Sequence, residues 1–139
     1  MWLFVPRYCY RCESAGSIEL GVCQVCGMEY PELPPELRPA VFVNAEPDGC
    51  VAELRGEIDL ATRGMAESRL MAALEGGSGY FLLDLDGVDF MDTQGVHMLL
   101  SLQRRARELG RDFLVRCGHG PCRRLLEAVG LQTMAEAAA

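Results

Sequence analysis

The sequence contains no lysine, so all thirteen of its basic residues are arginine. Twenty acidic residues leave a formal net charge of −7. Binding to nucleic acid depends mainly on neutralising phosphates with basic side chains, so this balance disfavours a dedicated nucleic-acid binder. We attribute the missing lysine to codon usage in a G+C-rich genome rather than to a chemical demand for guanidinium groups.

Long apolar runs are also missing. No stretch approaches the roughly 18 residues that span a bilayer, so we expect no membrane segment. The apolar opening, residues 1–6, is too short for a signal-peptide core and has no basic segment before it. Without a secretory signal, seven cysteines indicate thiols or metal ligands rather than disulfides. We therefore expect a cytoplasmic protein.

Four of the cysteines form two Cys-x2-Cys pairs near the start of the chain: Cys9, Cys12, Cys23 and Cys26. Two residues between ligands let both sulfurs of a pair face one ion, and four thiolates complete a closed tetrahedral Zn²⁺ shell. About thirty residues cannot build a stable core alone, which favours a metal over the alternatives of a redox pair or an adventitious cluster of thiols. We predict a small β zinc ribbon with short strands near 3–5 and 18–22 and one structural Zn²⁺ per chain.

The chain divides into three regions. Residues 1–30 form the zinc-ribbon-like module, and 31–39 hold four prolines in nine residues, which predicts a stiff, extended linker. Residues 40–139 are long enough for one domain. Their Ala-rich end, 135–139, is expected to fray.

The third region alternates strand and helix signals. Two short strands, 40–45 and 50–55, flank a Pro-Asp-Gly turn signal and predict a β-hairpin. Apolar spacing then predicts, in order, a helix, a strand buried on both faces, a helix, a short strand and a last helix, at 62–75, 80–85, 94–109, 112–116 and 122–129. The second of these helices is expected to bury Val96, Leu99 and Leu100.

Strands joined by crossover helices pair in parallel, whereas a hairpin adds an antiparallel member. The order β-β-α-β-α-β-α therefore predicts an α/β fold. We expect one mixed sheet of four strands with about three helices packed against it.

Three segments of this region resemble a known family. The first, 54–62, contains Gly-Glu-Ile-Asp; the second, 83–95, ends in Asp-Thr-Gln-Gly; the third, 121–131, begins the last helix. In this order and spacing they resemble the STAS domain, in particular bacterial anti-sigma factor antagonists. The resemblance covers about residues 40–132 and implies the same α/β fold.

The resemblance implies a regulatory protein rather than an enzyme. In such antagonists the Asp-Ser/Thr-x-Gly turn carries a hydroxyl that a partner anti-sigma factor kinase phosphorylates. The unphosphorylated domain binds that kinase, and the phosphorylated domain releases it. By position, Thr93 is the acceptor here, and the partner-binding residues are Asp59, Asp92, Gln94, Gly95 and His97.

The residues of this turn depart from the family in part. The common acceptor is Ser rather than Thr93, and Gln94 stands where a second small hydroxyl is frequent. His97 and Met98 replace small residues that are usual early in this helix, which adds bulk near the partner face. We expect Gly95 to allow a partner's backbone or its ATP phosphate to approach closely. The alternative for Asp92 and Thr93 is that they only cap the following helix.

Other functions stay open beside this one. A STAS scaffold without switching, a nucleotide-sensing module, or a zinc ribbon that binds nucleic acid or the transcription machinery would each fit part of the sequence. Cys117, His119 and Cys122 match no standard metal site, so a flexible loop is expected there. No nucleophile has a paired base, so we expect no enzymatic activity.

Overall fold

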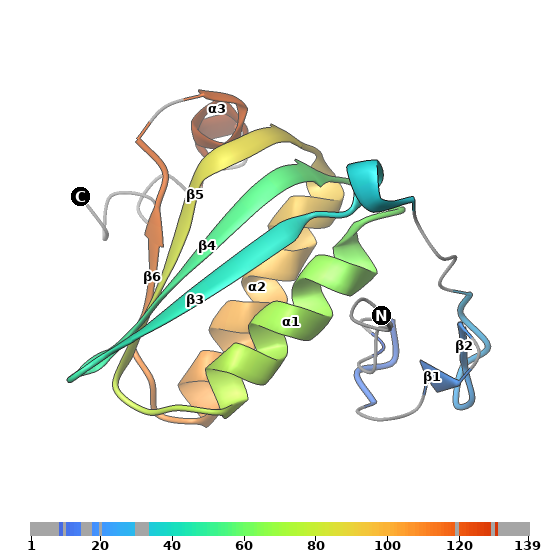
Figure 1. The fold of residues 1–139 in the computed structure, drawn as a ribbon, viewed down its shortest axis with the longest axis horizontal. Coiled ribbons are helices and arrows are strands. Elements are labelled where there is room, and N and C mark those ends of the chain that lie inside the picture. Colours follow the sequence, from blue (N-terminus) through green and yellow to red (C-terminus); the bar gives the residue numbers. More distant parts are fainter. Residues whose placement is uncertain are drawn as a thin grey trace.

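The computed structural model describes residues 9, 11–14, 18–19, 21–29, 34–118, 120–128 and 130. The described elements, in chain order (Figure 1), are β1 (Ile18–Glu19), β2 (Val22–Cys23), the 3-10 helix η1 (Pro35–Leu37), β3 (Ala40–Glu46), β4 (Gly49–Ile58), α1 (Arg63–Glu75), β5 (Tyr80–Met91), α2 (Thr93–Glu108), β6 (Phe113–Arg116) and α3 (Gly120–Ala128).

The main sheet has four strands in the order β3-β4-β5-β6. β3 and β4 form the predicted antiparallel hairpin, whereas β4–β5 and β5–β6 pair in parallel. The prediction of a mixed four-stranded sheet with three helices is therefore confirmed. Parallel pairing matters for the site, because it brings the carboxyl ends of β4 and β5 to one edge of the sheet.

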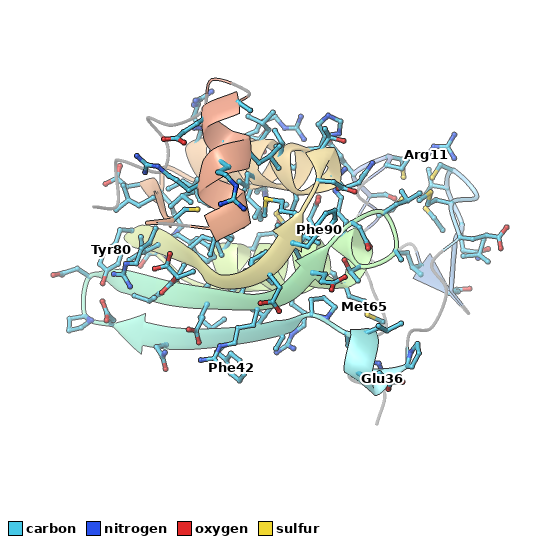
Figure 2. The ribbon with its side chains drawn as sticks, turned by 90° about the horizontal axis from the view of Figure 1, so that it is seen from above. Arg11, Glu36, Phe42, Met65, Tyr80 and Phe90 are labelled. Atoms are coloured by element: carbon cyan, nitrogen blue, oxygen red, sulfur yellow. The ribbon has the colours of Figure 1, made fainter. Side chains whose placement is uncertain are left out.

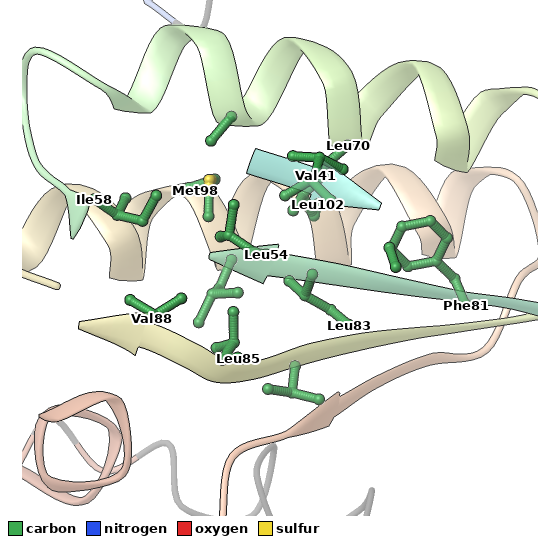
Figure 3. Packing of buried hydrophobic residues seen from close by; sticks show 14 of the residues in the cluster. Val41, Leu54, Ile58, Leu70, Phe81, Leu83, Leu85, Val88, Met98 and Leu102 are labelled. Carbon is green, nitrogen blue, oxygen red and sulfur yellow. The ribbon is translucent and has the colours of Figure 1, made fainter. Parts of the chain in front are cut away.

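Helices cover both faces of this sheet. α1 and α2 lie side by side on one face, and α3 packs on the other face against β5 (Figure 1). The core between these layers is apolar, with Leu54 and Ile58 of β4, Leu70 of α1 and Met98 of α2 all fully buried (Figure 3). β5 therefore lies between helices on both sides, as its apolar start predicts.

The extent of β5 differs from the prediction. The strand continues six residues beyond Leu85 and ends at Met91. In this extension Asp86 and Asp89 are exposed, while Val88 and Met91 are buried. The acidic side chains that suggested an end to the strand therefore point to solvent, and the strand extends to the start of α2.

The buried face of α2 also differs from the prediction. Val96 and Leu99 are buried as expected, but Leu100 is 40% exposed. Met98 and Leu102 are fully buried instead, so the expectation that Met98 adds bulk near the partner face is wrong. The apolar face of this helix is therefore rotated towards α1 and the sheet, away from Leu100.

A buried arginine joins the end of α1 to the start of β5. The guanidinium of Arg111 donates to the carbonyl oxygens of Leu74 (2.7 Å), Gly79 (2.9 Å), Ser78 (3.1 Å) and Tyr80 (2.9 Å). Arg111 is only 6% exposed and also lies over the ring of Phe81. Its charge is balanced by backbone dipoles, so it has a structural role.

The N-terminal module contains a two-stranded antiparallel sheet, β1–β2, in which Ile18 pairs with Cys23. The single strand predicted at 18–22 is instead two strands, because the chain turns at Gly21, whose φ is 77°. The strand predicted at 3–5, the histidine at 119 and the tail at 135–139 lie outside the described residues.

Candidate functional site

The predicted acceptor turn lies between the end of β5 and the start of α2. Asp92 is the N-cap of α2, with extended backbone angles, and its Oδ1 accepts a hydrogen bond from the Gln94 N–H at 2.8 Å. Thr93 is the first residue of the helix and its side chain is exposed. The turn therefore combines a capping aspartate with an exposed hydroxyl one residue later.

The end of β4 lies directly beside this turn. Ile58 of β4 pairs with Met91 of β5, and its carbonyl accepts a hydrogen bond from the Asp92 N–H at 3.3 Å. Asp59 follows Ile58 and is thus next to Asp92 on the same edge of the sheet. The structure places these two predicted site residues together.

Asp59 also shapes its own loop. Its Oδ1 accepts hydrogen bonds from the backbone N–H groups of Ala61 (3.0 Å) and Thr62 (3.1 Å). Thr62 in turn donates from Oγ1 to the Glu57 carbonyl at 2.7 Å. These bonds fix the start of α1, so the carboxylate of Asp59 is held in place rather than free to follow a ligand.

The other predicted partner-binding residues have different surroundings. His97 is exposed on α2 and is available at the surface. Gln94 is half-buried, and its side-chain oxygen accepts a hydrogen bond from Nη1 of Arg63 at 3.2 Å. The acceptor turn is thereby connected to the interior of the domain.

The structure explains the glycine at position 95 differently from the sequence prediction. It is buried, and a Cβ at this position would lie 2.2 Å from Cγ and 2.6 Å from Sδ of Met91. The missing side chain makes room for Met91 within the domain. The expectation that a partner's backbone or ATP approaches over Gly95 does not fit its burial.

The surface around the turn is acidic with two large apolar side chains. A cleft of about 190 Å³ next to Asp59 is lined by four acidic residues together with Arg38, namely Glu36, Glu57, Asp59 and Asp89. Leu60 is 61% exposed and Phe90 is 46% exposed, and Phe90 pairs across the sheet with Glu57 (Figure 2). Sequence patterns did not single out Leu60 or Phe90, since isolated exposed apolar residues give no periodic signal.

A buried ion pair behind the turn was also missed. Nε of Arg63 donates to Oε1 of Glu67 at 2.8 Å, and both residues are buried, at 6% and 0% exposure. Burial raises the pKa of Glu67 to about 7, although the charge and hydrogen bond of Arg63 act to lower it. The signal for it in the sequence was the position of Glu67, which directly follows Ala66 on the apolar face of α1.

The four N-terminal cysteines are brought together as predicted. Their Sγ atoms all lie within 4.8 Å of one another, with 3.6 Å between Cys9 and Cys26 and 3.7 Å between Cys12 and Cys23. Four thiolates at about 2.3 Å from a central Zn²⁺ would be separated by about 3.8 Å. The geometry is therefore compatible with a tetrahedral metal site.

The backbone around these cysteines forms two similar turns. Glu13 N–H donates to the Cys9 carbonyl at 2.7 Å, and Gly27 N–H donates to the Cys23 carbonyl at 2.9 Å. Glu13 and Gly27 follow the second cysteine of each pair and both have positive φ, 62° and 80°. Glu13 adopts at one turn the conformation for which glycine is preferred at the other.

Cys117 and Cys122 do not join this cluster. Each is 1% exposed within the main core. Within the described residues, the four N-terminal cysteines form the group with metal-ligand geometry. The described helices include none that is both long and apolar enough to cross a membrane.

Comparison with known proteins gives a family and two similar folds. A family model described as STAS domain matches residues 41–137. The crystal structure of an anti-sigma factor antagonist from Mycobacterium paratuberculosis is 24% identical, with a TM-score of 0.57 over 68% of this chain and 80% of that chain. The structure of the anti-sigma factor antagonist SpoIIAA in its unphosphorylated form is 18% identical, with a TM-score of 0.58 over 68% of this chain and 84% of that chain. None of the curated proteins gives a significant sequence match.

Proposed function

Because this chain belongs to the STAS domain family, we propose that it is a non-enzymatic regulator that acts as an anti-sigma factor antagonist. The unphosphorylated domain binds an anti-sigma factor with serine/threonine kinase activity, and phosphorylation of Thr93 releases that partner. The observation that carries this proposal is the exposed Thr93 at the first residue of α2, capped by Asp92 and adjacent to Asp59. Both similar structures are described as anti-sigma factor antagonists, which supports the assignment.

The physical basis of the switch is charge at an interface. A phosphothreonine adds about −1.5 to −2 charge and would stand beside Asp92 and near Asp59. A partner covering this surface would then bury like charges together, which costs desolvation and repulsion. The positive end of the α2 macrodipole tolerates the same charge, so the domain stays folded.

The proposed partner surface combines several contacts around Thr93. Leu60 and Phe90 provide exposed apolar area, and His97 lies one turn further along α2. The acidic side chains at this edge favour a basic surface on the kinase, which would also accelerate association.

The four-cysteine cluster is proposed to hold one structural Zn²⁺ per chain. Four thiolates leave no open coordination position, so the metal would stabilise the module rather than catalyse a reaction. We propose that residues 1–30 form a second interaction surface, joined by the linker 31–39 to the STAS domain at 40–139. The net charge of −7 argues against nucleic acid as the partner of that surface. We also propose that the protein acts in the cytoplasm, together with its kinase partner.

The test uses four proteins of the full chain side by side: wild type, Thr93→Ala, Thr93→Glu and a control, Ser101→Ala. Each is immobilised, proteins captured from lysate are identified, and the captured kinase is then incubated with labelled ATP and the soluble variants. We expect label on wild type and on the control Ser101→Ala, which lies on the same helix, but none on Thr93→Ala. Thr93→Glu should capture the least kinase.

Two outcomes count against the proposal. Label that persists in Thr93→Ala would remove Thr93 from the mechanism. Equal capture of the same partner by Thr93→Ala and Thr93→Glu would instead favour a scaffold or nucleotide-sensing domain without a switch.

A further inference from the structure

A chain of hydrogen bonds, buried at Glu67 and half-buried at Gln94, connects α1 to the acceptor turn. Glu67 is fully buried, and its Oε1 accepts from Nε of Arg63 at 2.8 Å. Nη1 of the same guanidinium donates to Oε1 of Gln94 at 3.2 Å. Gln94 directly follows Thr93, so the buried face of α1 is linked to the first turn of α2.

Arg63 is suited to make this link. It is the first residue of α1, and its backbone N–H donates to the Asp59 carbonyl at 2.9 Å, which fixes where the side chain starts. Its planar guanidinium donates in two directions at once, to Glu67 and to Gln94. A lysine ammonium is a point charge on a flexible stem and cannot reproduce that fork.

We propose that Arg63 and Glu67 are positioning residues for the acceptor turn: Glu67 holds the guanidinium, Arg63 holds the Gln94 side chain beside Thr93, and the protonation state of Glu67 sets how firmly the turn is held. The inference rests on the proposed role of Thr93 as the phosphoacceptor. Arg63 and Glu67 act on that residue through Gln94.

The surroundings of the second carboxylate oxygen of Glu67 favour its protonation. Oε2 is buried and has no hydrogen-bond partner among the described residues. A charged carboxylate with one uncompensated oxygen is costly to bury, whereas a neutral carboxyl is less so. Burial accordingly raises the pKa of Glu67 to about 7, so both protonation states are populated near neutral pH.

Other charged groups near Glu67 come from the elements packed against α1. Glu13 of the N-terminal module raises its pKa, and Arg104 of α2 lowers it. Glu13 and Arg104 carry opposite charges and lie together as an ion pair, so their effects on Glu67 largely offset one another. Burial and Arg63 therefore dominate the titration of Glu67.

Protonation of Glu67 changes the strength of its hydrogen bond with the Arg63 guanidinium. With Glu67 charged, the bond to Oε1 is charge-assisted; with Glu67 neutral, the same bond is weaker. The contact of Arg63 with Gln94 must respond, because both bonds share one rigid group. A pair that only stabilised α1 would titrate without any effect at Gln94.

The experiment is an NMR pH titration of the full chain, without kinase or nucleotide. The Glu67 side-chain carboxyl carbon, the Gln94 side-chain amide and the Thr93 backbone amide are followed from about pH 5 to about pH 9. Every sample carries His97→Gln, because that exposed imidazole lies on the first turns of α2. We expect the Glu67 and Gln94 signals to shift with the same midpoint, and Thr93 to follow.

Three variants separate positioning from stability. Glu67→Gln should abolish the shift at Gln94, whereas the matched control Glu75→Gln, an exposed acid of the same helix paired with Arg105, should leave it unchanged. Arg63→Lys should leave Glu67 titrating but remove the response of Gln94.

Two results overturn the inference: a Glu67 signal that titrates while Gln94 and Thr93 stay constant, or a Glu67 carboxyl that does not titrate in this range. Both are read in a single sample with both positioning residues intact, so neither depends on whether a variant of Arg63 or Glu67 folds. Failure of Thr93 to be phosphorylated by any kinase would end the proposed function without changing these signals, so the two failures are distinguishable.

Discussion

The backbone N–H of Asp92 donates a hydrogen bond to the carbonyl of Ile58, 3.3 Å away. This bond joins Asp92, the residue between β5 and α2, to Ile58, the last residue of β4. The strands β4 and β5 run in parallel. This bond is the reason that Asp59 and Asp92, 33 positions apart in the sequence, occupy one surface.

Loss of the helix cap should weaken the domain. Asp92→Ala removes the acceptor for the Gln94 N–H and should lower the free energy of unfolding by about 1 kcal/mol. Urea denaturation measures this value. Asp89→Ala, an exposed acid on the same strand end, is the control and should change stability by less than about 0.5 kcal/mol. An unchanged Asp92→Ala protein would mean that the cap is not needed.

The packing of Gly95 against Met91 can be tested by a double-mutant cycle. Gly95→Ala should destabilise the domain by about 1–3 kcal/mol, since the new Cβ overlaps the Met91 side chain. Met91→Ala costs stability alone but should make Gly95→Ala nearly neutral in its background. Additive effects in the cycle would contradict the internal role of this glycine.

Stability should depend on pH through Glu67. Its pKa is raised to about 7 in the folded protein from an ordinary value near 4.5. The folded state therefore binds a proton more tightly than the unfolded state, so this contribution is fully present below about pH 4.5 and is lost as pH rises to about 7. The loss is on the order of 3 kcal/mol.

The comparison of wild type with Glu67→Gln isolates that contribution, because other groups titrate equally in both proteins. The difference in unfolding free energy between the two should change between about pH 4.5 and about pH 7 and level off above that range. A constant difference over this range would show that Glu67 is not held with a raised pKa.

Metal removal should affect the N-terminal module far more than the sheet domain. Elemental analysis should find about one Zn per chain, lost in Cys9→Ser. Arg104 and Glu13 join the module to α2, and both side chains are about half exposed, at 51% and 48%. Such a pair contributes at most about 1 kcal/mol, so chelation should shift unfolding of the STAS domain only slightly. A module that stays folded without metal would contradict the zinc assignment.

Much of the fold was predictable because its signals are local. The hairpin followed from the turn at Pro47 and Asp48, and the parallel order followed from strands separated by helices. The length of β5 was not predictable from an acidic run, since alternating acids such as Asp86 and Asp89 fit an exposed strand face as well as a loop.

The site was predictable only in part. Thr93 and Asp92 were identified from the motif, and the register of two parallel strands then determined where Asp59 lies. Arg63 and Glu67 were not identified, because an Arg and a Glu four positions apart on a helix usually form an exposed pair. Only the packing of α1 against α2 shows that this pair is buried.

The central claim is tested most directly by the affinity of the captured kinase for the full-length protein with and without phosphate on Thr93. Isothermal titration calorimetry with the two forms gives both dissociation constants. Phosphorylated protein should bind at least about tenfold more weakly, equivalent to about 1.4 kcal/mol. Equal dissociation constants for the two forms would contradict the account.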